Sequence, residues 1–121
     1  MTLLLRIFIG GGVGSVLRYA IGLLTSQWGY VGKFPLATFV CNILGCFLIG
    51  LFNAYAQKMQ WDADMRLMLT VGLCGGFTTF STFSNEGLAM LQSGNYGLYA
   101  LYVALSIIGG LLAVMIGIHS V

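Results

Sequence analysis

Residues 96–119 read YGLYALYVALSIIGGLLAVMIGIH, a run of 24 residues that contains no Asp, Glu, Lys or Arg. About 20 consecutive apolar residues are enough for a helix to cross the hydrocarbon core of a bilayer. Similar apolar runs precede this one, and we predict helices over residues 2–24, 34–57, 65–92 and 96–119. The sequence therefore predicts an all-α integral membrane protein in which residues 1–121 form a single domain of four transmembrane helices.

The composition of the whole chain excludes a soluble domain. Only 7% of its 121 residues are charged and 59% are hydrophobic, whereas a soluble domain has about 25% charged residues. The net charge of +2, without basic runs, gives no reason to expect nucleic acid as a partner. No Walker motif for nucleotide binding and no Ser-His-Asp set occur, so we do not expect an enzyme. The 3 cysteines lie in apolar stretches without C-x-x-C spacing, which indicates packed thiols.

The positive charges are almost evenly divided between the two predicted sides of the membrane. Arg6, Lys58 and Arg66 lie on the side of the N-terminus, and Arg18 and Lys33 lie on the other. Lys and Arg normally mark the cytoplasmic side. Two interpretations stay open: one helix dominates and fixes the orientation, or copies of the chain insert both ways up.

Small residues recur four positions apart within the predicted helices. Such rows let helix backbones approach closely in a membrane. The rows predict tight packing and self-association, and four short helices enclose so little volume that a transport path would need a second copy. They include the pairs Gly10 and Gly14, Gly72 and Gly76, and Ser106 and Gly110.

Polar residues inside membrane spans are expensive and often functional. Thr38, Asn42 and Gly45 are spaced i, i+4, i+7, so they share one face of the second predicted helix. The Asn42 amide offers two N–H donors and one acceptor. One interpretation is an interhelical hydrogen bond that holds the bundle together; the other is a polar group that faces a transported ion.

Residues 72–86 read GLCGGFTTFSTFSNE, and this composition disfavours a continuous third helix. We predict a break in mid-membrane, because paired glycines are followed by hydroxyl-bearing and β-branched residues. Backbone freed by such a break must be buried in protein or line a polar cavity. Its carbonyls can bind a small cation, and helix N-terminal amides attract anions. The alternative is a kink repaired by the hydroxyl of Thr78 or Thr79.

Two aromatic rings follow the predicted break, with hydroxyl groups beside them. Phe80 and Phe83 are three positions apart, and Ser81 and Thr82 lie next to them. Ordinary packing explains most aromatic pairs at this spacing. However, the edge of an aromatic ring is positive, and ring edges with neutral donors would form an anion path without fixed positive charge. Conduction needs such weak and multiple sites.

The motifs taken together resemble those of the Fluc fluoride channels, also called CrcB. They are Gly11-Gly12-x-Gly14-x-x-x-Arg18-Tyr19, Thr38-x-x-x-Asn42-x-x-Gly45-x-Phe47-x-x-Gly50 and Gly75-Gly76-Phe77-Thr78-Thr79-Phe80-Ser81-Thr82-Phe83-x-x-Glu86. The resemblance implies an antiparallel, dual-topology homodimer in the bacterial inner membrane. Such dimers export fluoride passively through two pores and hold a structural Na⁺ at the dimer interface.

The resemblance also implies roles for particular residues. Phe80 and Phe83 match rings whose edges face fluoride, and Asn42 matches the pore asparagine. The sodium ligands would be the backbone carbonyls of Gly75 and Thr78 from both subunits. The remaining matches are a polar track of Ser81, Thr82, Thr38 and Tyr102, an acidic pore-end residue at Glu86, and a vestibular arginine at Arg18.

Two other functions compete with a fluoride channel. A small dual-topology multidrug exporter would need a carboxylate in the first helix, and residues 2–24 contain none. A non-transporting assembly subunit would use the glycine faces to bind other membrane proteins, and it would carry no ions alone.

Overall fold

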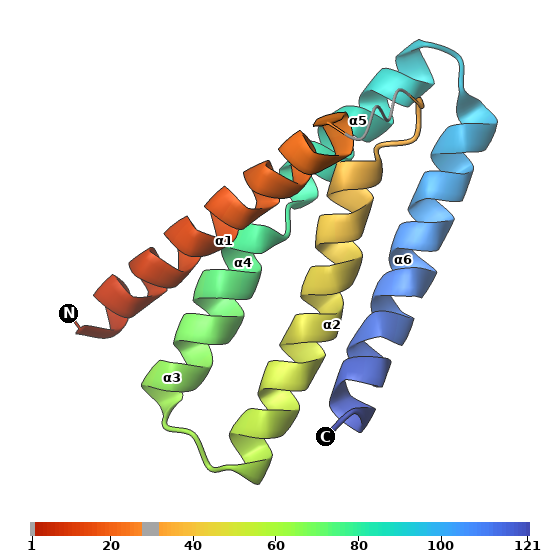
Figure 1. The fold of residues 1–121 in the computed structure, drawn as a ribbon. Coiled ribbons are helices and arrows are strands. Elements are labelled where there is room, and N and C mark those ends of the chain that lie inside the picture. Colours follow the sequence, from red (N-terminus) through yellow and green to blue (C-terminus); the bar gives the residue numbers. More distant parts are fainter. Residues whose placement is uncertain (1, 28–31) are drawn as a thin grey trace.

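The computed structural model describes residues 2–27 and 32–121. Within these ranges the chain forms helices and turns and no strand. Four segments are long and apolar enough to cross a membrane: Thr2–Gln27, Leu36–Lys58, Ala63–Gln92 and Tyr96–His119. The prediction of an all-α chain with four such helices is therefore confirmed. The elements in order are α1 (Thr2–Gln27), α2 (Leu36–Lys58), α3 (Ala63–Leu67), the π-helix η1 (Met68–Cys74), α4 (Gly75–Phe77), α5 (Phe80–Gln92) and α6 (Tyr96–His119) (Figure 1).

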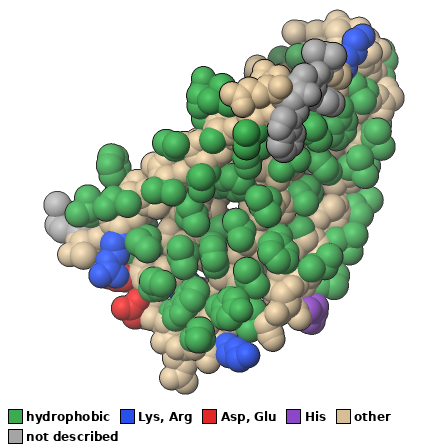
Figure 2. Space-filling model, in the orientation of Figure 1, with side chains coloured by type: hydrophobic (Ala, Val, Ile, Leu, Met, Phe, Trp, Pro, Cys, Tyr) green, Lys and Arg blue, Asp and Glu red, His purple; other side chains and the backbone are tan. Residues whose placement is uncertain are grey.

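The helices pack in two pairs along the long axis of the molecule. α2 packs mainly against α6, and α1 packs mainly against η1 and α4. The N-terminal end of α1, the α2–α3 connection and the C-terminus lie toward one end, and the α5–α6 connection lies at the other (Figure 1). Apolar side chains cover most of the visible face, and the charged ones gather toward its ends (Figure 2). This distribution matches a protein whose middle lies in lipid.

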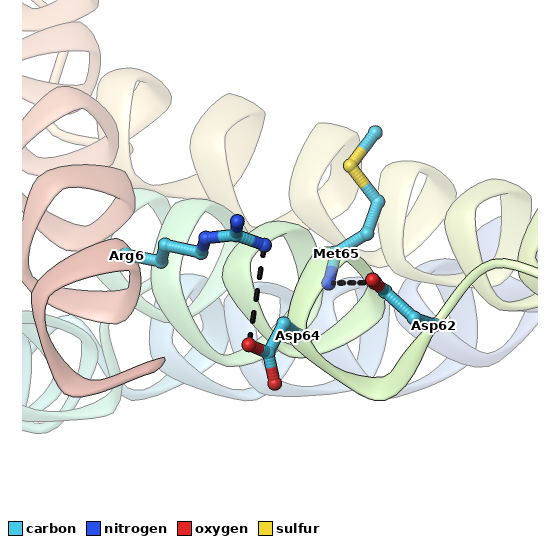
Figure 3. Close-up of polar contacts among 4 residues, drawn as sticks. All are labelled: Arg6, Asp62, Asp64 and Met65. Atoms are coloured by element: carbon cyan, nitrogen blue, oxygen red, sulfur yellow. Dashed lines mark hydrogen bonds and ion pairs between the residues drawn. The ribbon is translucent and has the colours of Figure 1, made fainter. Parts of the chain in front are cut away.

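The observed helix bounds differ from the predicted ranges by up to three residues. α1 continues to Gln27 instead of residue 24, and α2 begins at Leu36 instead of residue 34. The third span begins at Ala63 because Asp62 caps α3, accepting a hydrogen bond from the Met65 amide at 2.8 Å (Figure 3). Asp64 in the first turn also lies 4.0 Å from the Arg6 guanidinium. This ion pair joins α1 to α3 at the end of the bundle.

The glycine rows bring α1 and the third span into backbone contact. A Cβ atom on Gly14 would collide with the carbonyl oxygen of Leu73, and one on Gly76 would collide with that of Gly11. The predicted tight packing is therefore present, and it joins two helices of the same chain. Gly50 and Gly117 likewise allow α2 and α6 to approach closely, because a Cβ on either would meet backbone of the opposite helix.

Gly14→Ala is expected to lower the free energy of unfolding by about 1–3 kcal/mol, the usual cost of overpacking. The added methyl group has backbone atoms of Leu73 and Phe77 in its way, and backbone cannot move aside cheaply. Gly12→Ala is the matched control, since a Cβ there meets nothing within 4 Å and Ala favours a helix. Thermal unfolding in detergent measures both variants. Equal melting temperatures would show that the α1 contact contributes little.

The third span departs from a regular helix in two places. Met68–Cys74 is a π-helix, which the sequence did not predict; π-helical turns are rare and often mark functional sites. α4 then ends at Phe77, and the next two residues have extended backbone, with φ/ψ of −90°/158° at Thr78 and −152°/117° at Thr79. α5 restarts at Phe80. The two threonines therefore leave backbone groups that need partners outside the helix.

Candidate functional site

Asn42 on α2 binds the backbone of Thr79 through both ends of its amide. Its Nδ2 donates to the Thr79 carbonyl oxygen at 3.3 Å, and its Oδ1 accepts from the Thr79 N–H at 2.9 Å. The side chain thus replaces the helical partners that extended backbone lacks. The interhelical hydrogen bond considered from sequence is present. One N–H of the amide carries no bond to the described residues.

The hydroxyls at the interruption bond to local backbone. Thr79 caps α5, because its Oγ1 accepts from the Thr82 N–H at 3.2 Å and also donates to the Thr82 hydroxyl at 3.1 Å. The exposed Ser81 hydroxyl lies 3.3 Å from the same oxygen. Thr78 Oγ1 donates to the Cys74 carbonyl at 2.8 Å, as the alternative of a repaired kink requires. That bond gives the Cys74 carbonyl a partner, but the backbone of Thr78 and Thr79 is still extended.

Arg18 fixes the other side of the interruption. Its Nε donates to the Gly76 carbonyl oxygen at 3.1 Å, which joins α1 to α4. The side chain is half-buried. By contrast, the carbonyl oxygens of Gly75 and Thr78 accept no hydrogen bond from the described residues. Two free oxygens close together in sequence are suited to bind a small hard cation, which prefers oxygen ligands.

A cavity of about 400 Å³ lies beside the interruption, and we call it the central cavity. It brings Asn42, Phe80, Phe83, Gly75 and Thr78 together from among the predicted site residues. None of its lining side chains is charged. The complete lining, among described residues, is Asn42, Gly45, Cys46, Ile49, Thr70, Cys74, Gly75, Thr78, Thr79, Phe80, Phe83, Ser106 and Ile107.

A row of aromatic rings leads away from this cavity. The centroids of Phe80 and Phe83 are 5.9 Å apart, and Phe83 lies 4.9 Å from Tyr102 on α6. Tyr102 in turn meets the edge of Phe34 at 5.3 Å. Tyr102 is fully buried, whereas Phe80 is 79% exposed. The rings thus run from the outer face of the chain at Phe80 into its interior.

Four of the remaining predicted residues line two further cavities, whereas Ser81 and Tyr102 line none of the three. The side cavity, of about 330 Å³, contains Arg18, Thr38 and Thr82, together with Thr79. The end cavity, of about 480 Å³, contains Glu86. Its complete lining is Gly32, Lys33, Phe34, Pro35, Glu86, Ala89, Met90, Ser93 and Asn95. The predicted residues therefore surround one region of the chain but do not share one cavity.

Three side-chain oxygens near these cavities are buried, and the Glu86 carboxyl among them interacts with the Tyr102 hydroxyl. They belong to Glu86 (Oε1), Tyr102 (OH) and Ser106 (Oγ). Buried polar atoms are nearly always hydrogen-bonded to protein or to ordered water. The three oxygens therefore place buried polar groups along α5 and α6.

The comparison with known proteins identifies the family of the chain. The profile of the family described as CrcB-like protein, Camphor Resistance (CrcB), matches residues 5–118. The chain belongs to the CrcB family. A relative from Phocaeicola vulgatus, named Fluoride-specific ion channel FluC, is 52% identical over 118 residues that cover 98% of this chain and 97% of that one. A relative of the same name from Flavobacterium psychrophilum is 45% identical over 119 residues, covering 98% and 95%.

The resemblance to the CrcB family that the motifs indicated is thus confirmed, and the matched residues extend from the first span into the last. This CrcB protein is a multi-pass membrane protein. The individual roles inferred for its site residues remain predictions.

Sequence reasoning missed two parts of this CrcB site. Thr79 is the residue that Asn42 binds, but the two are 37 positions apart, and no pattern in the chain pairs them. Lys33 and Phe34 line the end cavity with Glu86. Their position directly before the second span, beside Pro35, was the available indication that they lie at an end of the bundle.

Proposed function

We propose that this CrcB protein is a fluoride channel that exports fluoride passively from the cell. The observation that carries the proposal is the uncharged lining of the central cavity, where Asn42 and the rings of Phe80 and Phe83 lie together. Polarised ring edges and neutral donors attract an anion without holding it tightly. The names of its relatives support the choice of fluoride.

Simple electrostatics gives the direction of transport. Hydrogen fluoride is neutral, so it crosses lipid unaided from an acidic medium and dissociates inside the cell. The membrane potential of a cell with a negative interior favours the exit of a monovalent anion by about 2.3 kcal/mol per 100 mV. A passive channel therefore lowers cytoplasmic fluoride without coupling to another ion, and no enzymatic step is required.

We further propose that the working unit is an antiparallel dual-topology homodimer with two pores. Phe80 is a pore residue in this scheme, yet it is 79% exposed on the single chain. A second copy would cover it and close the central cavity against lipid. The nearly even positive charge at the two ends, 3 against 2, supports insertion both ways up.

In this dimer the interruption at Thr78 and Thr79 lies within the membrane, and the free carbonyls of Gly75 and Thr78 bind a structural Na⁺ together with their counterparts in the second copy. The donor set fits a hard monovalent cation, since both ligands are oxygens without a hydrogen bond from the described residues. The ion would hold the two interruptions together at the dimer interface.

We assign the remaining predicted residues to the path of the ion. Ser81, Thr82, Thr38 and Tyr102 offer hydroxyls along it, and Glu86 stands at a pore end. Arg18 lies beside the side cavity as a vestibular cation, and its bond to Gly76 gives it a second, structural task.

Reconstituted vesicles test the proposal. Liposomes that contain only this protein and are loaded with fluoride are expected to release it within seconds to minutes once valinomycin carries K⁺ as the counter-ion, as a fluoride electrode records. The same vesicles loaded with chloride should retain it. Equal release of both anions would exclude a fluoride-selective channel, and no release of either would favour an assembly subunit. Proton-driven uptake of an organic cation would favour the exporter, although α1 has no carboxylate.

A further inference from the structure

The end cavity combines opposite charges at one end of the molecule. Lys33 is the one basic residue of its described lining, and Glu86 is the one acidic residue. Lys33 is exposed and precedes α2, whereas Glu86 is half-buried on α5. The ammonium group thus belongs to the solvent side of this cavity and the carboxyl to its inner side.

Aromatic contacts join the end cavity to the central cavity. Phe34 lines the end cavity and meets Tyr102 at 5.3 Å, and Tyr102 meets Phe83, which lines the central cavity, at 4.9 Å. The Glu86 carboxyl and the Tyr102 hydroxyl, which interact with each other, lie beside these rings. The end cavity therefore lies at the Phe34 end of the row of rings that leads to the central cavity.

We propose that the end cavity is one mouth of the anion path and that Lys33 is its steering residue. The inference rests on the proposed function. Without Lys33, Glu86 would be the only charged side chain of the described lining, and its carboxylate would repel an approaching anion. The Lys33 ammonium offsets this repulsion and raises the local concentration of a small anion, as charges lining a cleft do. Lys33 acts through this field and needs no contact with the ion inside the pore.

The expected size of the effect follows from Coulomb's law. A unit charge about 7 Å from an ion in water changes the local ion concentration about threefold. The field reaches about 30 Å at an ionic strength of about 10 mM but only about 3 Å at about 1 M. A steering role therefore fades with added salt, whereas a structural role does not.

The test compares Lys33→Gln with Lys33→Arg and Lys58→Gln in vesicles of zwitterionic lipid. Lys58 is the matched control, because it is exposed at the opposite end of α2 and lines none of the three cavities. Initial fluoride efflux is measured at low fluoride, with the ionic strength set by a large impermeant anion at about 10 mM and about 1 M. We expect Lys33→Gln to slow efflux about threefold at low ionic strength and not at high. Lys33→Arg and Lys58→Gln should match the unmodified protein.

The possible results separate the two proposals. Equal rates for Lys33→Gln and the unmodified protein at low ionic strength would overturn the steering role while leaving the channel intact. A loss that persists at high ionic strength would also overturn it, since screening should remove a field effect. No efflux from the unmodified protein would overturn the channel itself, and the role of Lys33 with it.

Discussion

Asn42→Asp is expected to reduce fluoride efflux about thirty-fold in liposomes. The substitution places a negative charge in the lining of the central cavity, which holds no charged side chain among described residues. A charge about 8 Å from the ion, at an effective dielectric constant of about 20, costs the anion about 2 kcal/mol. That energy corresponds to about a thirty-fold change.

The same substitution also weakens the bond between α2 and the interruption. The Nδ2 that donates to the Thr79 carbonyl becomes an oxygen, so two acceptors face each other across 3.3 Å. The bond from the Thr79 N–H to Oδ1 survives. Loss of this hydrogen bond, with the Thr79 carbonyl left unsatisfied, costs about 1–3 kcal/mol, so the folded protein should still be recovered from detergent. A melting curve on the same sample separates lost conduction from lost folding.

Asn53→Asp is the control for Asn42→Asp. Asn53 lies on the same helix, where its Oδ1 accepts from Arg66 Nε at 3.3 Å, and it lines none of the three cavities. Its substitution adds the same charge near an exposed arginine, so efflux should stay near that of the unmodified protein. Unchanged efflux in Asn42→Asp would remove Asn42 from the path. Equal losses in both variants would point to a general effect of the added charge.

Hydropathy was sufficient to predict the spans because lipid leaves the backbone few choices. Inside a bilayer every N–H and C=O must be satisfied within the protein, so an apolar run of about 20 residues has to be a helix or part of a barrel. α6 accordingly has the predicted bounds, Tyr96–His119. The sequence did not predict the π-helix at Met68–Cys74, which packs mainly on α1. The partners of the glycine rows likewise depend on which helices become neighbours.

The residue types of the candidate site could be predicted, but not their connections. Polar and aromatic residues within an apolar chain identified Asn42, Phe80 and Phe83, because each is costly or directional in lipid. The structure adds that Asn42 binds Thr79 and that Phe83 touches Tyr102. Such contacts join helices far apart in sequence. They follow from helix packing, which the periodicity of one chain does not specify.

Phe80→Ile is expected to reduce fluoride efflux by up to about tenfold, because directed ring contacts are worth about 0.5–1.5 kcal/mol each and 1.4 kcal/mol is a factor of ten. Ile retains apolar bulk in the lining of the central cavity but lacks the polarised C–H edge of the ring. Phe80 is the first residue of α5, where Thr79 provides the cap through backbone and hydroxyl groups. The exchange therefore leaves the capping bonds of the interruption in place.

Two further variants show whether the ring edge is responsible. Phe80→Tyr keeps most of that edge, so it should conduct better than Phe80→Ile. Phe8→Ile is the matched control, because Phe8 is 77% exposed on α1 and lines none of the three cavities; its efflux should be unchanged. Efflux of each variant is measured beside its elution volume in detergent, which reports assembly. Full conduction by Phe80→Ile would reject the ring edge as an anion ligand. An apolar side chain of similar size would then be sufficient for conduction at this position.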